Sequence, residues 1–431
     1  MSNFLERYQK IIEQINIVSF FLLLLSLALP WCFTQPLFAI WLITWFLECR
    51  WLKKKNIHFG KHTIPILLLC GFVAWEALSL LWTIDREQGI LELQKHLPIY
   101  AVLLVALFGV NKYYQSHQTK VALILGCLLA IFGYCMIIYW YRVQNTLPIS
   151  LNQFSFWSMF GNGPIGEIKH RSHLCIILLI AFLFSFDVYQ YYSKQYSTKL
   201  IGSVISVIDI IFITTIILTG SRTAMLLLPI LLIILFLKFY QGRWKKIITC
   251  SIVVGIITLF CLGTNYNDRL STVKNDLLHL HQNGLESISS TKEPRLQIYS
   301  CALCHWNEFG FWGVGYGGSE KEMMDLFAKD GLTNCLAKQY GIHNRYLKVW
   351  MEMGPIALLF MLFILIGSAF FHTGQVRKNV AYICIVFGWS MLTENVLTMI
   401  GALYIFFTLI TLVQIEQHEQ DLQRLDHPQS V

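Results

Sequence analysis

Residues Tyr340–Phe371 read YGIHNRYLKVWMEMGPIALLFMLFILIGSAFF. From Val349 onward this run is apolar for long enough to cross the ~30 Å hydrocarbon core of a bilayer as a helix. Similar runs recur along the whole 431-residue chain, in which 55% of residues are hydrophobic and only 13% are charged. Because the runs are continuously apolar and do not alternate, they exclude a β-barrel. The sequence therefore predicts an all-α polytopic membrane protein.

We expect about twelve membrane-spanning helices from the length and apolarity of these runs. They cover residues 15–30, 34–48, 63–82, 97–110, 120–141, 172–188, 201–219, 223–239, 246–264, 346–371, 378–394 and 396–415. A polar stretch with amphipathic helical pieces separates the ninth span from the tenth. The chain thus divides into an N-terminal transmembrane bundle of about nine helices (1–264), an extracytoplasmic helical cap (265–342), about three C-terminal transmembrane helices (343–415) and a cytoplasmic tail (416–431).

Lysine and arginine are distributed unevenly between the two sets of loops. With a cytoplasmic N-terminus, the inside segments carry 18 of these residues and the short outside connections carry six. This excess satisfies the positive-inside rule, so both termini are expected in the cytoplasm. We expect no cleavable signal peptide, because the start MSNFLERYQKIIEQ is mixed in charge and no small-residue cleavage site follows.

The formal net charge of +8 does not indicate a nucleic-acid partner. The cations are dispersed between apolar segments, where membrane orientation accounts for them. Membrane lipids are therefore expected partners and nucleic acid is not. The twelve cysteines lie mostly inside apolar runs, where they behave as small hydrophobes.

Arg222 lies in a short outside turn, LTGSRTAMLL, between two long apolar spans. It is either a snorkelling anchor at the membrane surface or a clamp for an anion, since a guanidinium matches two phosphate oxygens at once. Arg222 alone does not separate these readings.

Arg295 opens the outside segment KEPRLQIYSCALCHWNEFGFWGVGYGG, residues 292–318. Pro294 suits the first turn of a helix and leaves Arg295 beside the helix N-terminus. The glycine turn that follows lets the backbone approach a ligand and present N–H groups, so Gly315 and Tyr316 are candidate substrate-binding residues. The turn follows a helix and lacks the Walker lysine, which argues against a nucleotide site.

Two further outside segments place polar residues directly before or at the start of membrane spans. His343, Asn344 and Arg345 introduce the tenth span, and Lys169, His170 and Arg171 introduce the sixth. Four separate outside segments thus each offer a cation, and His343 adds a titratable base. Each feature alone has a structural explanation. Together they predict an extracytoplasmic pocket for an anionic, membrane-held substrate.

The sequence CALCH, Cys301–His305, matches the C-x-x-C-H signature of c-type haem attachment. The alternative is a chance match in an amphipathic helix with Cys301 and Cys304 on its buried face, and we favour it because no sixth haem ligand is marked. No cofactor is therefore expected, and a disulfide involving Cys335 is favoured over haem. No compact His/Asp/Glu cluster is visible in the outside loops, so no metal site is expected.

These stretches together resemble the O-antigen ligase and polymerase superfamily. The similarity rests on the order of TGSRTA, RLQIYSCAL, GFWGVGYGG and HNRYLKVWMEMGPIALL, followed by SMLTENVLTMIGALYIFF. It covers the architecture of the whole chain, with the sharp motifs between Arg222 and Gly354. One departure is that FGFWGVGYGG lacks the proline often found before this glycine turn in the family.

The resemblance implies a metal-independent, inverting glycosyltransferase of the membrane-embedded C type. It implies a glycan donor on undecaprenyl diphosphate, a lipid A–core sugar or other glycan as acceptor, and a site on the periplasmic face of a bacterial inner membrane. By motif, Arg222 and Arg295 correspond to arginines that hold the diphosphate, His343 to the histidine required for transfer, and Arg171 to a further basic residue. A ligase is the favoured member.

Other functions remain open from the sequence. The alternatives are a repeat-unit polymerase, then a protein O-oligosaccharyltransferase, which usually carries extra C-terminal sequence, and then a transporter for an anionic solute. A transporter places charged residues near the middle of the membrane in broken helices, whereas the candidate cations here stand at the outside mouth of the spans. The sequence does not identify the glycan, the acceptor, the linkage or the oligomeric state.

Overall fold

A computed structural model describes residues 2–48, 60–109, 114–144, 170–219, 221–239, 278, 294–396 and 400–426. All regular elements in these ranges are helices, which confirms the all-α class. Six helices are long and apolar enough to cross a membrane: Arg7–Ser26, Arg86–Phe108, Ser116–Gln144, Arg171–Tyr192, Thr198–Thr219 and Arg345–Phe371. The number of about twelve spans remains a prediction, and the span expected at 246–264 lies outside the described residues.

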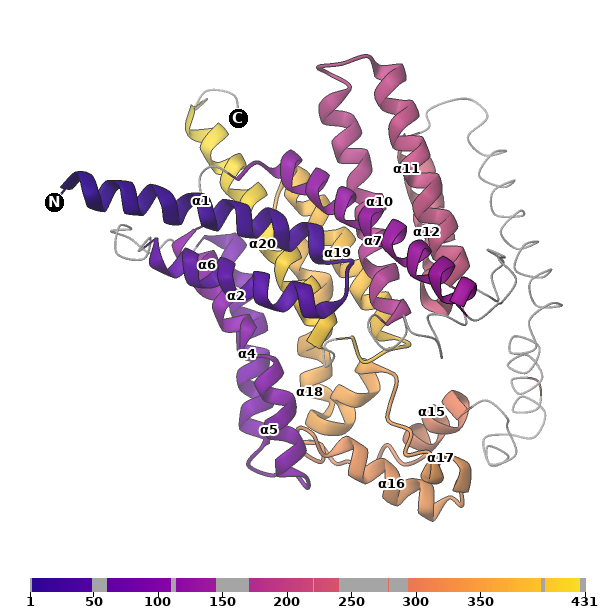
Figure 1. The fold of residues 1–431 in the computed structure, drawn as a ribbon. Coiled ribbons are helices and arrows are strands. Elements are labelled where there is room, and N and C mark those ends of the chain that lie inside the picture. Colours follow the sequence, from indigo (N-terminus) through magenta and orange to yellow (C-terminus); the bar gives the residue numbers. More distant parts are fainter. Residues whose placement is uncertain are drawn as a thin grey trace.

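The helices are labelled in Figure 1 in chain order. They are α1 (Ser2–Ser26), α2 (Trp31–Leu47), η1 (Lys61–Thr63), α4 (Ile64–Ser79), α5 (Arg86–Lys95), α6 (Pro98–Phe108), α7 (Ser116–Gln144), α10 (Arg171–Tyr192), α11 (Thr198–Thr219), α12 (Arg222–Phe239), α15 (Pro294–Cys304), α16 (Ser319–Lys329), α17 (Thr333–Ala337), α18 (Arg345–Gly367), η3 (Ser368–Phe371), α19 (Gly374–Met391) and α20 (Ile400–Asp426).

Helix α10 lies at the centre of the helical bundle. Its side chains are apolar on all sides from Leu174 to Phe184 and almost every one is buried. A helix that is hydrophobic all round is stable only when neighbours cover every face. Helices α7, α11, α12, α19 and α20 provide that cover. The first turn of α10, which carries Arg171, is therefore fixed to the core of the protein.

Helix α18 is kinked at Gly354, where φ is +77°, and Pro355 follows. Pro355 has no N–H to donate to the carbonyl of Met351, four residues earlier. The glycine turn before α16 supplies the missing donor, since Val314 N–H bonds the Met351 carbonyl at 2.9 Å and Gly315 N–H bonds the Glu352 carbonyl at 2.8 Å. The glycine turn and the proline kink are thus one structural unit.

Helices α15, α16 and α17 form the described part of the expected cap. They share a second apolar core, with Ile298, Phe327 and Cys335 among its buried side chains, and Met351 of α18 completes it. Figure 1 shows these helices at the end of the molecule opposite the start of α1 and the end of α20. The cap therefore rests on α18 just before its kink.

Candidate active site

His343 lies in the extended segment between the cap and α18, with its side chain 37% exposed. Its backbone is held from two sides. Tyr299 on α15 donates a hydrogen bond from its hydroxyl to the His343 carbonyl at 3.0 Å, and the Asn395 side chain donates to the Ile342 carbonyl at 2.9 Å. The position of the imidazole is thus coupled to the cap and to the segment that follows α19.

Asn344 caps the N-terminus of α18. Its side-chain oxygen accepts hydrogen bonds from the N–H groups of Tyr346 at 2.9 Å and Leu347 at 3.1 Å. Such a cap satisfies N–H groups that have no partner within the helix. This role explains an amide at the mouth of a membrane span, and its predicted part in substrate binding remains a prediction.

Arg295 and His343 both face Glu394, a residue that the sequence did not mark as functional. The Arg295 guanidinium donates to Glu394 Oε1 at 3.1 Å, and His343 Nδ1 lies 3.8 Å from Glu394 Oε2. Ser172, in the first turn of α10, donates from its hydroxyl to Glu394 Oε1 at 3.5 Å. The carboxylate is only 10% exposed, whereas the Arg295 side chain is 30% exposed. The one sign of Glu394 in the sequence is the run of three polar residues TEN, 393–395, between two apolar runs.

His170 and Arg171 reach the same place from the start of α10. His170 is the N-cap residue, and its ring accepts from Ser172 N–H at 3.4 Å. Burial lowers the pKa of His170; Glu394 opposes this, and the positive charges of Arg171, Arg295 and a protonated His343 lower it further. Interaction with all four groups indicates that the predicted basic residues of α10, α15 and the segment before α18 share one electrostatic environment.

The α11–α12 turn, which carries Arg222, packs beside Glu394 because residues adjacent to each are in contact. Thr223 contacts Thr393 through their hydroxyl groups, and the Thr223 carbonyl accepts a hydrogen bond from the Trp389 ring at 3.0 Å. The backbone of Arg222, the first residue of α12, is therefore close to the residues around Glu394. The Arg222 side chain and the whole of Lys169 lie outside the described residues, so their roles stay predictions.

The pKa of His343 is lowered from its ordinary value. Burial is the main cause, Glu394 opposes it, and Arg295 adds to the lowering. A lowered pKa keeps the imidazole neutral near pH 7, which is the form that accepts a proton. With its proton on Nδ1, facing Glu394, the ring presents Nε2 as the acceptor. The 3.8 Å separation from Glu394 is that of an ion pair, longer than the hydrogen bond of about 2.6–3.2 Å that orients a general base.

The other cations at the start of α18 have buried protein partners. Arg345 donates to Glu76 on α4 at 2.6 Å, and both side chains are fully buried. Lys348 donates to the two oxygens of Glu92 on α5 at 2.7 and 2.9 Å. These ion pairs join α18 to α4 and α5. They account for both cations without a ligand, and the predicted substrate contact of Arg345 remains a prediction.

The glycine turn also directs its N–H groups at protein. Tyr316 N–H donates to Ser79 Oγ at 3.1 Å, and Gly317 N–H donates to Glu352 Oε1 at 3.2 Å. Gly315 has φ +87°, and a Cβ there would come within 2.1 Å of the Thr83 backbone. The turn thus has the close backbone approach expected from its glycines, but the approach is to α18 and to the α4–α5 loop. Ligand binding by Gly315 and Tyr316 remains a prediction.

The cysteines of the cap are free thiols. Cys301 and Cys335 are buried and Cys304 is exposed. Cys335 donates to Gln297 Oε1 at 3.0 Å, so the disulfide considered for it is absent here. The expectation that the outside segments hold no compact His/Asp/Glu cluster was wrong, because His305 contacts both Glu308 and Asp330. The sequence missed this cluster because Asp330 follows the next helix, α16, and only folding brings it to His305.

Comparison with known proteins agrees with the motifs. A family model described as O-antigen ligase matches residues 207–362, a range that contains Arg222, Arg295 and His343. A protein of Haemophilus influenzae, described as uncharacterized, is 20% identical over 338 residues, which is 76% of this chain and 77% of that protein. The resemblance inferred from the sequence is thus confirmed over residues 207–362, where the chain is similar to the O-antigen ligase family.

Proposed function

We propose that this protein transfers a glycan from undecaprenyl diphosphate to a sugar hydroxyl, with lipid A–core as the favoured acceptor. The match to the O-antigen ligase family suggests a membrane glycosyltransferase that uses lipid-linked glycans in general. The observation that supports the finer proposal is the meeting of Arg295, His343 and Glu394 at the mouth of the spans. This arrangement places an anion-binding group and a base side by side.

The basic residues suit the diphosphate of the donor. Arg295 and Arg171 come from separate helices, and Glu394 is the carboxylate that Arg295 contacts. A guanidinium binds phosphate oxygens in bidentate fashion. Because the diphosphate gains negative charge as it leaves, fixed positive charge around it stabilises the transition state more than the ground state. Arg222 would add a further charge from the α11–α12 turn.

His343 supplies the base in this mechanism. The acceptor oxygen bonds the anomeric carbon as the bond from that carbon to the diphosphate oxygen breaks. The electron pair leaves with the diphosphate, and the acceptor proton passes to His343 Nε2. Glu394 stabilises the imidazolium that forms, since its carboxylate lies 3.8 Å from Nδ1. A single displacement of this kind inverts the anomeric configuration.

We further propose an inner-membrane location with both termini in the cytoplasm and the site facing the periplasm. The loop charges support this orientation, as does the position of the cap at the far end of the molecule from the start of α1 and the end of α20 (Figure 1). Periplasmic reporter fusions at Gly284 and at the C-terminus test it. Activity at Gly284 and none at the C-terminus is expected, and the reverse pattern would overturn it.

Two of the alternative functions share this chemistry. A repeat-unit polymerase or a protein O-oligosaccharyltransferase uses the same donor with another acceptor. Nothing in the described residues identifies the acceptor, and the ligase is favoured by the family description alone. A transporter fits less well, because Arg295, His343 and Glu394 lie at helix ends and loops, whereas transporter sites lie near the middle of the membrane.

The test is glycan transfer by purified protein with defined lipid-linked donor and several acceptors. His343→Ala is expected to abolish transfer while donor binding remains. His343→Gln keeps a hydrogen-bonding group but cannot take a proton near neutral pH, so activity in this variant would assign His343 to orientation only. Wild-type transfer by well-folded His343→Ala protein would remove the histidine from the mechanism. Donor uptake into vesicles without transfer would favour the transporter.

A further inference from the structure

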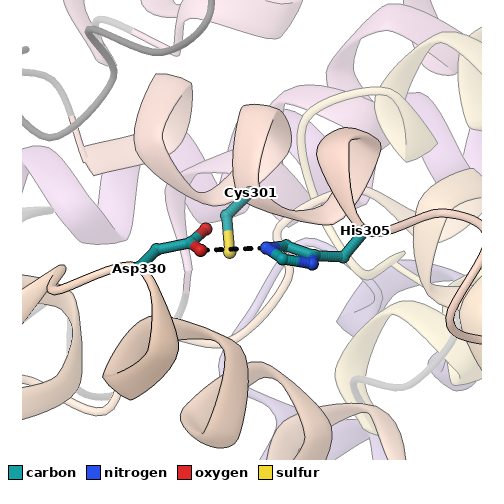
Figure 2. Close-up of side chains that lie close together, drawn as sticks. All are labelled: Cys301, His305 and Asp330. Carbon is teal, nitrogen blue, oxygen red and sulfur yellow. Dashed lines mark hydrogen bonds and ion pairs between the residues drawn. The ribbon is translucent and has the colours of Figure 1, made fainter.

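Three side chains of the cap converge at a place remote from the helix start that carries Arg295. One ligand atom each from Cys301, His305 and Asp330 lies within 4.8 Å of the other two. Figure 2 shows them pointing toward one another from the end of α15 and from the residue after α16. Cys301 is buried, His305 is partly buried and Asp330 is the most exposed. Thiol, imidazole and carboxylate are the ligand types that zinc uses in proteins.

Nδ1 of His305, the ring nitrogen outside the cluster, has the carboxylate contact expected in a metal-binding histidine. His305 Nε2 faces Asp330 Oδ1 at 2.9 Å, inside the cluster, while Nδ1 contacts Glu308 Oε1 at 2.7 Å on the outside. Histidines that bind metals usually donate their other N–H to a carboxylate, which fixes the tautomer and the ring orientation. A proton on Nδ1 leaves the Nε2 lone pair directed at the cluster.

The surroundings favour a cation. Helix α15 ends at Cys304 and α16 ends at Lys329, so the C-terminal ends of two helices lie beside the cluster. Cations are stabilised at helix C-termini by the partial negative charge of these carbonyls. The ammonium of Lys329, the last residue of α16, binds Glu308 at 2.7 Å, a residue outside the cluster.

We propose that Cys301 Sγ, His305 Nε2 and the Asp330 carboxylate bind one zinc ion, with water completing the tetrahedron. Zinc bonds of about 2.0–2.3 Å place tetrahedral ligand atoms roughly 3.3–3.8 Å apart. The observed spread of up to 4.8 Å therefore closes with a shift of about 1 Å, within the reach of side-chain rotation. The ion would tie the end of α15 to the end of α16. It would stiffen the helix whose other end holds Arg295.

Haem attachment through C-x-x-C-H fits the cap less well. Both cysteine sulfurs must bond the porphyrin, but Cys301 is 1% exposed inside the apolar core of the cap, while Cys304 is exposed. Attachment at Cys301 would require that core to open. A small ion needs no such opening. The cysteine and histidine of this signature are thus better explained by a metal site that recruits Asp330.

The experiment uses the full-length protein in detergent, purified through a tag without histidine. Zinc content after dialysis is expected at about one ion per chain in the wild type. Cobalt in place of zinc is expected to give a thiolate-to-cobalt charge-transfer band and visible bands of tetrahedral intensity. Cys301→Ser, His305→Gln and Asp330→Asn should each lose bound zinc, and Cys301→Ser should also lose the charge-transfer band. Cys304→Ser is the matched control, because it removes an exposed thiol three residues along the same helix and should keep both signals.

Several results would overturn the proposal. They are wild-type protein without stoichiometric zinc, equal zinc in the Cys301→Ser and Cys304→Ser variants, a disulfide at Cys301 found by alkylation and mass spectrometry, or a haem spectrum. If a variant fails to fold, the cobalt spectrum of the wild type still tests the proposal, because it reports thiolate coordination without any substitution. Since the readout is metal content, a zinc-loaded protein that transfers no glycan would leave this proposal intact and count only against the proposed function.

Discussion

Arg295 donates a hydrogen bond to Glu394 at 3.1 Å, although the two residues stand 99 positions apart in the chain. The same carboxylate lies 3.8 Å from His343 Nδ1, so Glu394 has two tasks in the proposed mechanism. Without substrate it balances the charge of Arg295. During transfer it stabilises the imidazolium of His343. Substitution of Glu394 is therefore expected to slow the chemical step while leaving Arg295 freer to bind the donor.

Glu394→Gln should lower kcat by roughly 10²-fold or more, because an amide cannot stabilise the protonated base. The KM for the lipid-linked donor should stay the same or fall, since Arg295 is released to bind phosphate. Steady-state kinetics with purified protein measures both constants. Ser172→Ala is the control, because it removes only a 3.5 Å contact to the same carboxylate and should change kcat little. A higher donor KM with unchanged kcat would assign Glu394 to binding.

The pH dependence of transfer follows from the environment of His343. Its pKa is lowered by burial, raised by Glu394 and lowered by Arg295, with a net lowering. The base must be neutral, so kcat should fall as the pH drops through a value below the ordinary histidine pKa. Glu394→Gln removes a raising influence and should move this acid limb to lower pH. Arg295→Gln removes a lowering influence and should move it to higher pH. If the acid limb of the kcat profile moves in neither variant, His343 is not the titrating base.

Lysine should not replace the arginines of the site. A point charge cannot reproduce the two parallel hydrogen bonds of a guanidinium to phosphate, so Arg222→Lys and Arg295→Lys should fail nearly as badly as the alanine variants. The expected loss is on the order of 2–4 kcal/mol in transition-state stabilisation, or roughly 10²–10³ in rate. Transfer assays on equal amounts of folded protein measure it. Near-normal rates in both lysine variants would support membrane anchoring instead.

Variants of the Arg345–Glu76 ion pair distinguish a structural role of Arg345 from a role in substrate binding. Arg345→Met leaves the buried Glu76 with His96 alone, at 2.6 Å, and should destabilise the protein by about 3–5 kcal/mol. Adding Glu76→Gln removes the uncompensated charge and should recover much of that loss. Thermal unfolding in detergent measures both effects. If the double variant folds but transfers no glycan, Arg345 contacts the substrate; recovery of transfer assigns it to the fold.

These contacts show what the sequence could and could not predict. Apolar runs predicted the helices, charge counts predicted the membrane orientation, and local motifs marked His343 and Arg295 as candidate site residues. Glu394 was missed because its partners come from α10, α15 and the segment before α18, and a lone acid between two apolar runs gives no local sign of them. Arg345 appeared available for substrate for the same reason, since Glu76 is 269 positions away. Local patterns therefore identify reactive residue types, whereas the partners that set their roles depend on packing.

The glycine turn offers the last prediction, because Gly313 in the turn and Gly331 after α16 separate steric contact from backbone strain. Gly313 has φ +71°, and a Cβ there would lie 2.4 Å from the Glu352 carbonyl carbon. Gly331 has φ +68° with no atom within 4 Å of such a Cβ. Alanine at Gly331 should cost only the left-handed strain, about 1–2 kcal/mol. Alanine at Gly313 should cost clearly more, because α18 must move away from the turn.

That movement would also reach the site. The turn bonds the Met351 and Glu352 carbonyls, and α18 begins two residues after His343. Gly313→Ala should therefore lower both the melting temperature and the transfer rate of the folded protein, while Gly331→Ala lowers the melting temperature alone. Equal destabilisation of the two variants would show that close packing of the turn against the kink of α18 does not contribute to stability. A large loss of Gly313→Ala stability with full transfer activity would show that the kink does not position His343.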